Sequence, residues 1–440
     1  MIERSPLLCI AAAAVMARDR SPPNSPPAKR RKESSTTTVA SLGDDILLEI
    51  FLRLPCLATL VRAALTCRVW RSAVASSPAF RRRFRERHPA PLLGLVFNPP
   101  GAVQDPALPA FPSFVPARGT DRDQAAAVRG GDFFLTSLQE RPGVHNGWEI
   151  HDCRGGYVLL ANGDQETMAV VNPLARRSVR FFDFGHEDTL EGNRTYGVVR
   201  RACLLCPDED PTSFRVVIIA HDKSRVRATV FSSATGEWSL RPWKHIPARP
   251  RRGRGKWWIQ NSNMQANGFL YWVSKTRKYM VTLDTATMDF SVHELPIFLQ
   301  NQHCTFVVGE MKNDEACIVY AINFTVGVLF RRTESDGVDR WVLERVELLE
   351  TQLVRLLGEV MENYNEVQVV AVRDGFAYLA TSEKLSDSGA PSWFLSLCLE
   401  TMILEKLFQR TRDSSVYPYV MPWPPSLVGN YGRFAPEDGT

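Results

Sequence analysis

The sequence predicts an α+β multidomain protein in which a small domain of three helices precedes a large all-β domain. Residues 39–88 have the apolar spacing of helices, and from about residue 92 onward short apolar runs alternate with turn-forming residues. One hairpin pattern then recurs at intervals of about 50–60 residues, which indicates a repeat architecture. With 440 residues, the chain is long enough for two or three domains with cores of their own.

Residues 1–38 predict a disordered basic tail. They are rich in Ser, Pro and Arg, lack apolar periodicity, and carry seven basic residues against three acidic ones. The run Lys29, Arg30, Arg31 and Lys32 has the form of a short nuclear import signal, although a solvated basic tail has the same composition. We therefore expect the protein in both the nucleus and the cytoplasm.

Composition predicts neither a membrane protein nor an enzyme. No stretch approaches the ~18 apolar residues of a membrane span, and the nine scattered cysteines fit a reducing compartment. The close pair Cys203 and Cys206 lacks the second pair of ligands that a zinc site requires, so we expect no metal and no cofactor. Nucleophile-elbow and complete phosphate-loop motifs are also missing from the sequence, and we expect no catalytic residues.

The first predicted helix is apolar on too many sides for a small free-standing domain. Ser41 followed by Asp44 resembles a capping box at its start, and Pro55 ends it. At 100° per residue, the apolar side chains of residues 46–54 cover an arc of about 240°, whereas an ordinary surface helix needs little more than 100°. Residues 56–67 are similarly apolar. Because each helix can bury only one face inside the domain, the other face implies a binding partner.

The run from Leu42 to Phe80 resembles an F-box, and we assign residues 39–88 to this domain. The matching positions, in order, are Leu42, Gly43 and Ile46 at the opening, Ile50 and Phe51 within the helix, Leu54 and Pro55 at its stop, and Cys67, Arg68 and Trp70 at the closing element. The departure is Gly43, where the family usually has a Pro that pre-sets the helix start. The layout of the whole chain resembles a large grass-type family of plant F-box proteins.

This resemblance implies a substrate-receptor subunit of a cullin-type ubiquitin ligase, which does no chemistry itself. F-box helices bind a Skp-type adaptor that bridges to a cullin, and another part of the chain binds an unknown protein target. The residues expected to bind the adaptor are Leu42, Ile46, Leu47, Ile50, Phe51, Leu54, Pro55, Leu60, Val61, Leu65 and Trp70. The alternative is that these helices form a cap buried on the rest of the chain.

The C-terminal region contains near-repeats of one hairpin. Two copies align without a gap from Ser232 and Asp284 onward, and weaker copies begin at Asn172 and Glu400. A short polar residue that opens a tight turn between two apolar runs predicts a β-hairpin. Because another apolar strand precedes each copy, the unit predicts a blade of a β-propeller, of kelch-like rather than WD type.

The number of blades and the limits of the β domain follow less directly from the pattern. Five units are visible, and a sixth blade could combine residues 92–138 with the C-terminal segment. We predict a Pro-rich linker at 89–130 and the propeller at 131–431. A large irregular β-sandwich is the alternative architecture.

A basic stretch without acidic residues marks the predicted target-binding site. Between Trp238 and Leu283 the chain has ten Lys and Arg residues and no Asp or Glu. Its centre, residues 249–258, combines Arg and Gly with two Trp residues, and propeller loops commonly carry binding residues. The residues predicted to bind the target are Arg251, Arg252, Arg254, Trp257 and Trp258. The alternatives are a solvated loop and a nucleic-acid site, which uses the same residue types.

Overall fold

The computed structural model describes most of the chain beyond the N-terminal tail. The described residues are 43–99, 111–117, 121–139, 147–162, 167–175, 179–183, 201–207, 210, 213–221, 225–245, 263–333, 339–358, 363–383, 391–410 and 415–428. The chain divides into a helical unit, which ends at His88 and resumes at Pro424, and a β unit from Pro89 to Trp423. The C-terminal end of the chain therefore belongs to the same unit as the N-terminal helices.

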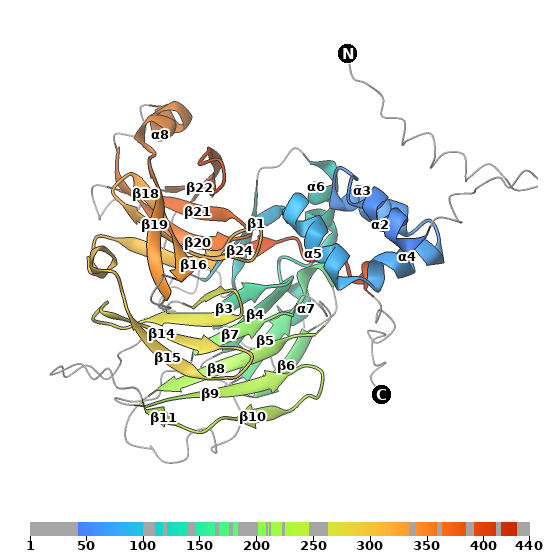
Figure 1. The fold of residues 1–440 in the computed structure, drawn as a ribbon, viewed down its shortest axis with the longest axis horizontal. Helices are drawn as coiled ribbons and strands as arrows, with labels where there is room; N and C mark the ends of the chain where they lie inside the picture. Colours follow the sequence, from blue (N-terminus) through green and yellow to red (C-terminus); the bar gives the residue numbers. More distant parts are fainter. Residues whose placement is uncertain are drawn as a thin grey trace, which may run out of the picture. The chain divides into compact units, whose positions relative to one another are not determined.

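Four α-helices occupy the described part of residues 39–88 (Figure 1): α2 (Asp44–Phe51), α3 (Leu57–Ala64), α4 (Arg68–Ala75) and α5 (Pro78–Arg87). The start of α2 after Gly43 agrees with the sequence, but the prediction of three helices is wrong by one. Ser77 and Pro78 separate α4 from α5. The hydroxyl of Ser77 accepts the N–H of Phe80 at 3.2 Å, and Pro78 takes the first helical position, where a missing N–H costs nothing.

Six sheets of antiparallel strands form the described part of the β unit, and they are the blades of a propeller (Figure 1). From the innermost strand outward, blade 1 contains β3 (Trp148–Arg154), β4 (Tyr157–Asn162), β5 (Thr167–Val171) and β6 (Val179–Asp183). Blade 2 contains β7 (Arg201–Leu205), β8 (Arg215–His221), β9 (Arg225–Ser232), β10 (Trp238–Leu240) and β11 (Lys244–His245). Blade 3 contains β12 (Met264–Ala266), β13 (Phe269–Val273), β14 (Tyr279–Asp284) and β15 (Phe290–Glu294).

The second half of the ring follows the same order. Blade 4 contains β16 (Thr305–Glu310), β17 (Ala316–Ile322), β18 (Thr325–Thr333) and β19 (Asp339–Leu348). Blade 5 contains β20 (Tyr364–Arg373), β21 (Phe376–Glu383), β22 (Ser392–Cys398) and β23 (Leu404–Arg410), and blade 6 contains β24 (Val416–Val420), β1 (Leu92–Phe97) and β2 (Ser113–Pro116). Helices α6 (Arg122–Gly130) and α7 (Thr136–Gln139) precede β3, and α8 (Glu350–Leu357) precedes β20.

The innermost strands of the blades run in the same direction around the ring. Strand β3 packs against β7 and β24, and β16 packs against β12 and β20. Two hydroxyls show the parallel alignment: that of Tyr417 donates to the carbonyl of Ile150 at 3.0 Å, and that of Tyr419 donates to the carbonyl of Gly156 at 2.8 Å. We call the end of the propeller at the first residues of these strands the start face, and the end at their last residues the stop face.

The ring closes through blade 6, which combines both ends of the β unit. Strand β24 pairs with β1, and β1 pairs with β2, which confirms the predicted composite sixth blade. The prediction of a linker at 89–130 is wrong for these strands, because the apolar run Leu92–Phe97 is buried in the blade. The predicted limit at residue 431 is also too late, because the β unit ends at Trp423.

The predicted hairpin repeats lie at the turns between the third and fourth strands of the blades. The carboxylate of Asp284 accepts the N–H of Ala286 at 2.8 Å, and the amide oxygen of Asn172 accepts the N–H of Leu174 at 3.2 Å. Polar side chains thus fix these turns, as the sequence predicts. Neighbouring sheets share apolar cores on their broad faces, so the β-sandwich alternative is wrong. The kelch-like character of the blades stays a prediction.

Candidate functional site

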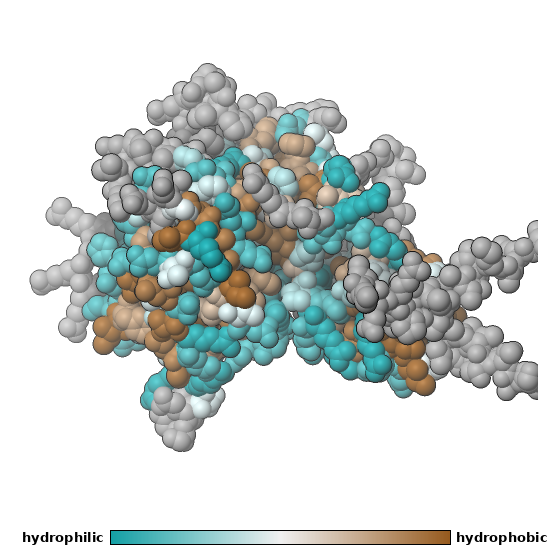
Figure 2. Space-filling model, turned by 90° about the horizontal axis from the view of Figure 1, so that it is seen from above, coloured by the Kyte–Doolittle hydropathy of each residue, from teal (hydrophilic) through white to brown (hydrophobic). Residues whose placement is uncertain are grey.

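Three large apolar side chains are exposed on the described part of the helical unit. Ile46 on α2 is 56% exposed, Leu65 after α3 is 50% exposed, and Val69 on α4 is 61% exposed. The space-filling view shows hydrophobic residues reaching the surface among hydrophilic ones (Figure 2). Ile46, Leu65 and Val69 are therefore the candidate binding residues of this unit.

The structure divides the predicted adaptor-binding residues into a buried and an outer set. Leu47, Phe51 and Leu60 are at most 3% exposed, so they support the surface instead of forming it. Leu42 lies outside the described residues. The prediction omits Val69, because the closing element of the F-box motif specifies Cys67, Arg68 and Trp70 but no particular residue at position 69. The outer set consists of the exposed or half-buried residues Ile46, Ile50, Leu54, Pro55, Val61, Leu65 and Trp70.

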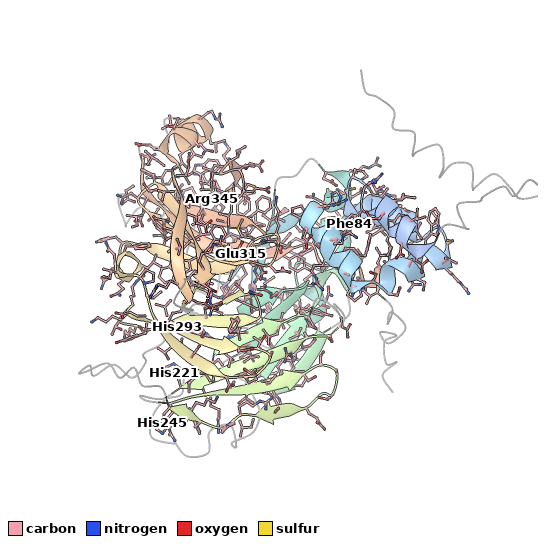
Figure 3. The ribbon with its side chains drawn as sticks, in the orientation of Figure 1. Phe84, His221, His245, His293, Glu315 and Arg345 are labelled. Atoms are coloured by element: carbon pink, nitrogen blue, oxygen red, sulfur yellow. The ribbon has the colours of Figure 1, made fainter. Side chains whose placement is uncertain are left out.

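The buried set holds the outer set in place. Helices α2 and α3 both pack against α4, and the ring of Phe51 on α2 meets the ring of Trp70 on α4 edge to face at 5.5 Å. The thiol of Cys67 caps α4 by accepting the N–H of Trp70 at 3.5 Å. Phe84 on α5, labelled in Figure 3, is fully buried. Trp70 is therefore positioned by packing before any partner binds.

The C-terminal end of the chain completes this unit. The 3₁₀ helix η6 (Pro425–Leu427) packs against α4, and the guanidinium of Arg71 donates to the carbonyl of Ser426 at 2.8 Å. Leu427 and Val428 are at most 4% exposed. Sequence reasoning did not find this contact, because the two partners are 355 residues apart and share no motif. The position of α4 therefore depends on contacts with α2 and α3 and with η6 near the C-terminus.

An ion pair crosses the axis of the propeller near its stop face. Arg154 at the end of β3 binds the carboxylate of Glu310 at the end of β16, and both side chains are nearly buried. Blades 1 and 4 lie opposite one another in a ring of six, so the pair spans the ring. Arg373 on β20 adds blade 5: it lies 3.7 Å from the carboxylate of Asp152 and donates to the carbonyl of Cys153 at 2.9 Å.

This network keeps the guanidinium of Arg154 charged, whereas burial raises the pKa of the Glu310 carboxyl. Burial alone would lower the pKa of Arg154, but the carboxylates of Glu310 and Asp152 outweigh that effect and raise it, so the guanidinium stays charged. The carboxylate of Asp152 also accepts the N–H of Leu204 from blade 2 at 2.8 Å. The arrangement therefore ties four blades together, and the acids and bases are engaged with each other rather than directed at a ligand.

Blades 1 and 2 contain the three cysteines Cys153, Cys203 and Cys206. Cys203 is buried in β7, and the thiol of Cys206 donates to the carbonyl of Arg154 at 3.3 Å. Burial raises the pKa of the neighbouring Cys153 thiol to about 12. The described residues contain no group of three or more His, Cys, Asp and Glu side chains suited to hold a metal ion. None of their helices is long and apolar enough to cross a membrane.

The predicted target-binding and import residues lie outside the described residues. This applies to Arg251, Arg252, Arg254, Trp257 and Trp258, and to Lys29, Arg30, Arg31 and Lys32. The described chain resumes after the basic loop at Asn263, whose amide donates to the carbonyl of Ala202 at 2.7 Å and whose oxygen accepts the indole N–H of Trp272 at 3.2 Å. Asn263, the residue before β12, therefore lies at the start face of blade 3.

A helical unit with an exposed apolar surface, joined to a six-bladed propeller, defines a binding protein of the F-box type. The chain belongs to the family described as F-box protein AT5G49610-like, beta-propeller, whose family model matches residues 149–427. A second family model, described as F-box-like, matches residues 39–86. This combination is typical of adaptor proteins without enzymatic activity.

Solved structures resemble the chain at low identity. They include a protein from Lactobacillus plantarum (11% identity, 74% of this chain and 99% of that chain covered, TM-score 0.35) and a Nidogen/Laminin complex (10% identity, 74% and 96%, TM-score 0.36). A luciferin-regenerating enzyme is 9% identical, with 64% and 80% covered and a TM-score of 0.33. A comparison with curated protein sequences found no match.

Proposed function

We propose that the chain is the substrate-receptor subunit of a Skp–cullin–F-box ubiquitin ligase. The observation that supports this most is the outer set on the helical unit, above all Ile46 and Leu65, together with the exposed Val69 on α4. These side chains are exposed, whereas Leu47, Phe51 and Leu60 beneath the surface are buried. Covering such side chains is favourable, at roughly 25 cal/mol for each Å² of apolar surface removed from water. A Skp-type adaptor would cover them and connect the chain to a cullin. The receptor then supplies proximity, while the ubiquitin-carrying enzyme supplies the reactive thioester.

Placing charges on the outer apolar set is expected to abolish adaptor binding without unfolding the chain. In the double variant Ile46→Asp and Leu65→Asp, two carboxylates would have to be buried in the interface without partners. We expect binding to a Skp-type adaptor of the same organism to weaken at least ~100-fold, measured by calorimetry on the full chain. Because both side chains are about half exposed in the free chain, its melting temperature should change little.

The matched control places the same charges on exposed apolar residues of the propeller. Val354 on α8 and Ile403 before β23 are 52% and 53% exposed, close to the values for Ile46 and Leu65. The double variant Val354→Asp and Ile403→Asp should bind the adaptor normally. Equal binding by the wild type and the F-box variant would show that the outer set is not the adaptor site.

We further propose that the target binds through Arg251, Arg252, Arg254, Trp257 and Trp258. The support is the stretch of ten basic residues without an acidic one, together with the position of Asn263, where the chain leaves this loop. An acidic surface of a target would complement it. Nucleic-acid binding by the same loop, residues 249–258, is the second candidate, and steep salt dependence of binding to nucleic acid would favour it.

Replacing Lys29, Arg30, Arg31 and Lys32 with Ala is expected to shift a fluorescent fusion of the full chain from the nucleus to the cytoplasm. We propose that this run directs nuclear import, because four consecutive cations have the form of an import signal. The seven Arg residues between positions 68 and 88 stay unchanged and control for general basic charge. An unaltered nuclear fraction would show that these four residues belong to a solvated basic tail and do not direct import.

A further inference from the structure

The connection between blades 3 and 4 presents two apolar side chains at the start face. It runs from Leu295 to Cys304 and contains the 3₁₀ helix η4 (Ile297–Gln300). Ile297 is 86% exposed and Phe298 is 39% exposed, whereas their neighbours Leu295 and Leu299 are buried. The buried leucines anchor the connection, so the exposed pair is held outward on a fixed backbone.

The turn between β13 and β14 fixes this connection from blade 3. The guanidinium of Arg277 donates to the carbonyl of Leu299 at 3.0 Å and to that of Cys304 at 2.6 Å. On the other side of the exposed pair, the N–H of Leu295 donates to the carbonyl of Lys278 at 2.9 Å. Residues 295–304 are therefore bonded to the turn both before and after Ile297 and Phe298.

The apolar surface continues onto blade 4. The ring of Phe298 lies 5.3 Å from the ring of Tyr320 on β17, and Tyr320 lies over Gly327 on β18, which leaves no room for a Cβ. Directly opposite Gly327 on the edge strand β19 is Val346, which is 54% exposed. Residues paired across strands share one face of a sheet. Phe298, Tyr320 and Val346 therefore follow one another across that face.

A second row of paired residues extends the same face. Ile322 on β17 pairs with Thr325 on β18, which pairs with Leu348 on β19, and Leu348 is 56% exposed. Arg345 of β19, labelled in Figure 3, points to the other face of the blade, where it donates to the carbonyl of Glu400 at 3.1 Å. We call the exposed residues Ile297, Phe298, Val346 and Leu348 the blade 4 shelf.

Positive charge borders the shelf on the side of blade 3. The turn of residues 274–278 and the connection of residues 295–304 contain no Asp or Glu, and the exposed Glu294 at the end of β15 directly precedes the connection. Arg277 uses its guanidinium on backbone carbonyls, whereas Lys275 and Lys278 are exposed. An apolar surface next to two exposed ammonium groups is complementary to a ligand that carries an apolar side chain near carboxylates.

We propose that the blade 4 shelf docks an acidic segment of the target protein. A bulky apolar side chain of that segment would cover Ile297 and Phe298, and its carboxylates would face Lys275 and Lys278. This inference rests on the proposed receptor function and names the substrate chemistry that the receptor selects. The partner is protein rather than nucleic acid, because the side chains most exposed on the shelf are aliphatic and offer little for bases to stack on.

A peptide selection on the full chain bound to its Skp-type adaptor tests the proposal. The probe is a random 16-residue peptide library displayed on phage, and the enriched peptides are then measured by fluorescence anisotropy. We expect enriched sequences to hold one bulky apolar residue beside at least two acidic ones. The variant Ile297→Ser with Phe298→Ser should weaken their binding about 10- to 100-fold. The variant Lys275→Glu with Lys278→Glu should weaken it about 10-fold and reduce its salt dependence.

Two matched variants keep the test specific. Ile403→Ser removes an apolar side chain that is 53% exposed at the turn before β23, and Arg122→Glu with Arg129→Glu reverses two exposed charges on α6. Both should leave peptide binding within about twofold of the wild type. Because Phe298 also touches Tyr320, the single variant Ile297→Asp, at a residue that is 86% exposed, tests the shelf if the double variant loses stability.

Several results would overturn the proposal. These are a selection that enriches no sequence, enriched peptides without acidic residues, or peptide binding that the shelf variants leave unchanged. Displacement of the peptides from the shelf by mixed-sequence single-stranded DNA would assign the surface to nucleic acid instead. The adaptor retained by each sample is measured in parallel. Loss of the adaptor with normal, shelf-dependent peptide binding would contradict the receptor function and leave the shelf as a peptide site.

Discussion

Truncation of the chain after Thr411 is expected to prevent the propeller from closing, so that the shortened chain aggregates. The deletion takes away β24, the innermost strand of blade 6, which pairs with β1 and packs against β3 and β20. It also removes Tyr419, which is fully buried and donates to the carbonyl of Gly156 at 2.8 Å. An open ring exposes strand edges and the apolar faces of two blades, so aggregation should follow.

The soluble fraction and the melting temperature of the purified chain measure this effect. We expect either loss of solubility or a melting temperature lowered by at least ~10 °C. Truncation after Val428 keeps β24 and η6 and is the matched control, which should melt like the full chain. Truncation after Trp423 keeps the closed ring but removes η6, and it should weaken adaptor binding while the propeller stays folded. A chain cut after Thr411 that melts normally would show that closure does not depend on β24.

Replacing Glu310 with Ala is expected to destabilise the propeller by ~3–5 kcal/mol, because the guanidinium of Arg154 would stay buried without its partner. Arg154 cannot relieve this cost by losing its proton at ordinary pH. The double variant Arg154→Met and Glu310→Leu removes both charges and should recover most of the lost stability. Recovery in the double variant would separate the effect of an unpaired charge from that of lost packing.

Chemical denaturation of the full chain measures both variants, with tryptophan fluorescence reporting on the propeller. The control is Asp339→Ala, which breaks the exposed pair of Arg331 and Asp339 on blade 4 and should cost at most ~1 kcal/mol. If Glu310→Ala costs no more than this control, the axial pair does not hold the ring together.

Local sequence signals predicted the parts of the fold that local chemistry determines. Asp284 and Asn172 mark hairpin turns because their side chains bond to backbone groups only two residues away, so the repeats could be recognised without the fold. The boundary between α4 and α5 is also determined locally. Ser77 and Pro78, a helix cap followed by a proline at the first helical position, are the sequence signal for it. The run Leu92–Phe97 has the apolar pattern of a strand, but the proline-rich residues that follow it indicate a linker, so the sequence points in two directions at this place.

Contacts between distant parts of the chain left no signal in a single sequence. Arg154 and Glu310 are 156 residues apart, and nothing near either residue indicates that a ring of six blades brings them together. The blade 4 shelf has the same origin, because Phe298 and Val346 come to lie on one face only through strand pairing and the packing of Tyr320. Burial of Leu47 and Phe51 also depends on packing, since apolar periodicity marks both sides of an over-apolar helix alike.

Reconstitution with the adaptor and cullin tests the central claim most directly. The full chain is mixed with a Skp-type adaptor and a cullin of its own organism, and the mixture is examined by size-exclusion chromatography with light scattering. We predict that the chain and the adaptor elute together with one copy of each, that the cullin joins them when added, and that the variant Ile46→Asp with Leu65→Asp elutes alone. A folded wild-type chain that elutes without any adaptor would contradict the assignment as a ligase receptor.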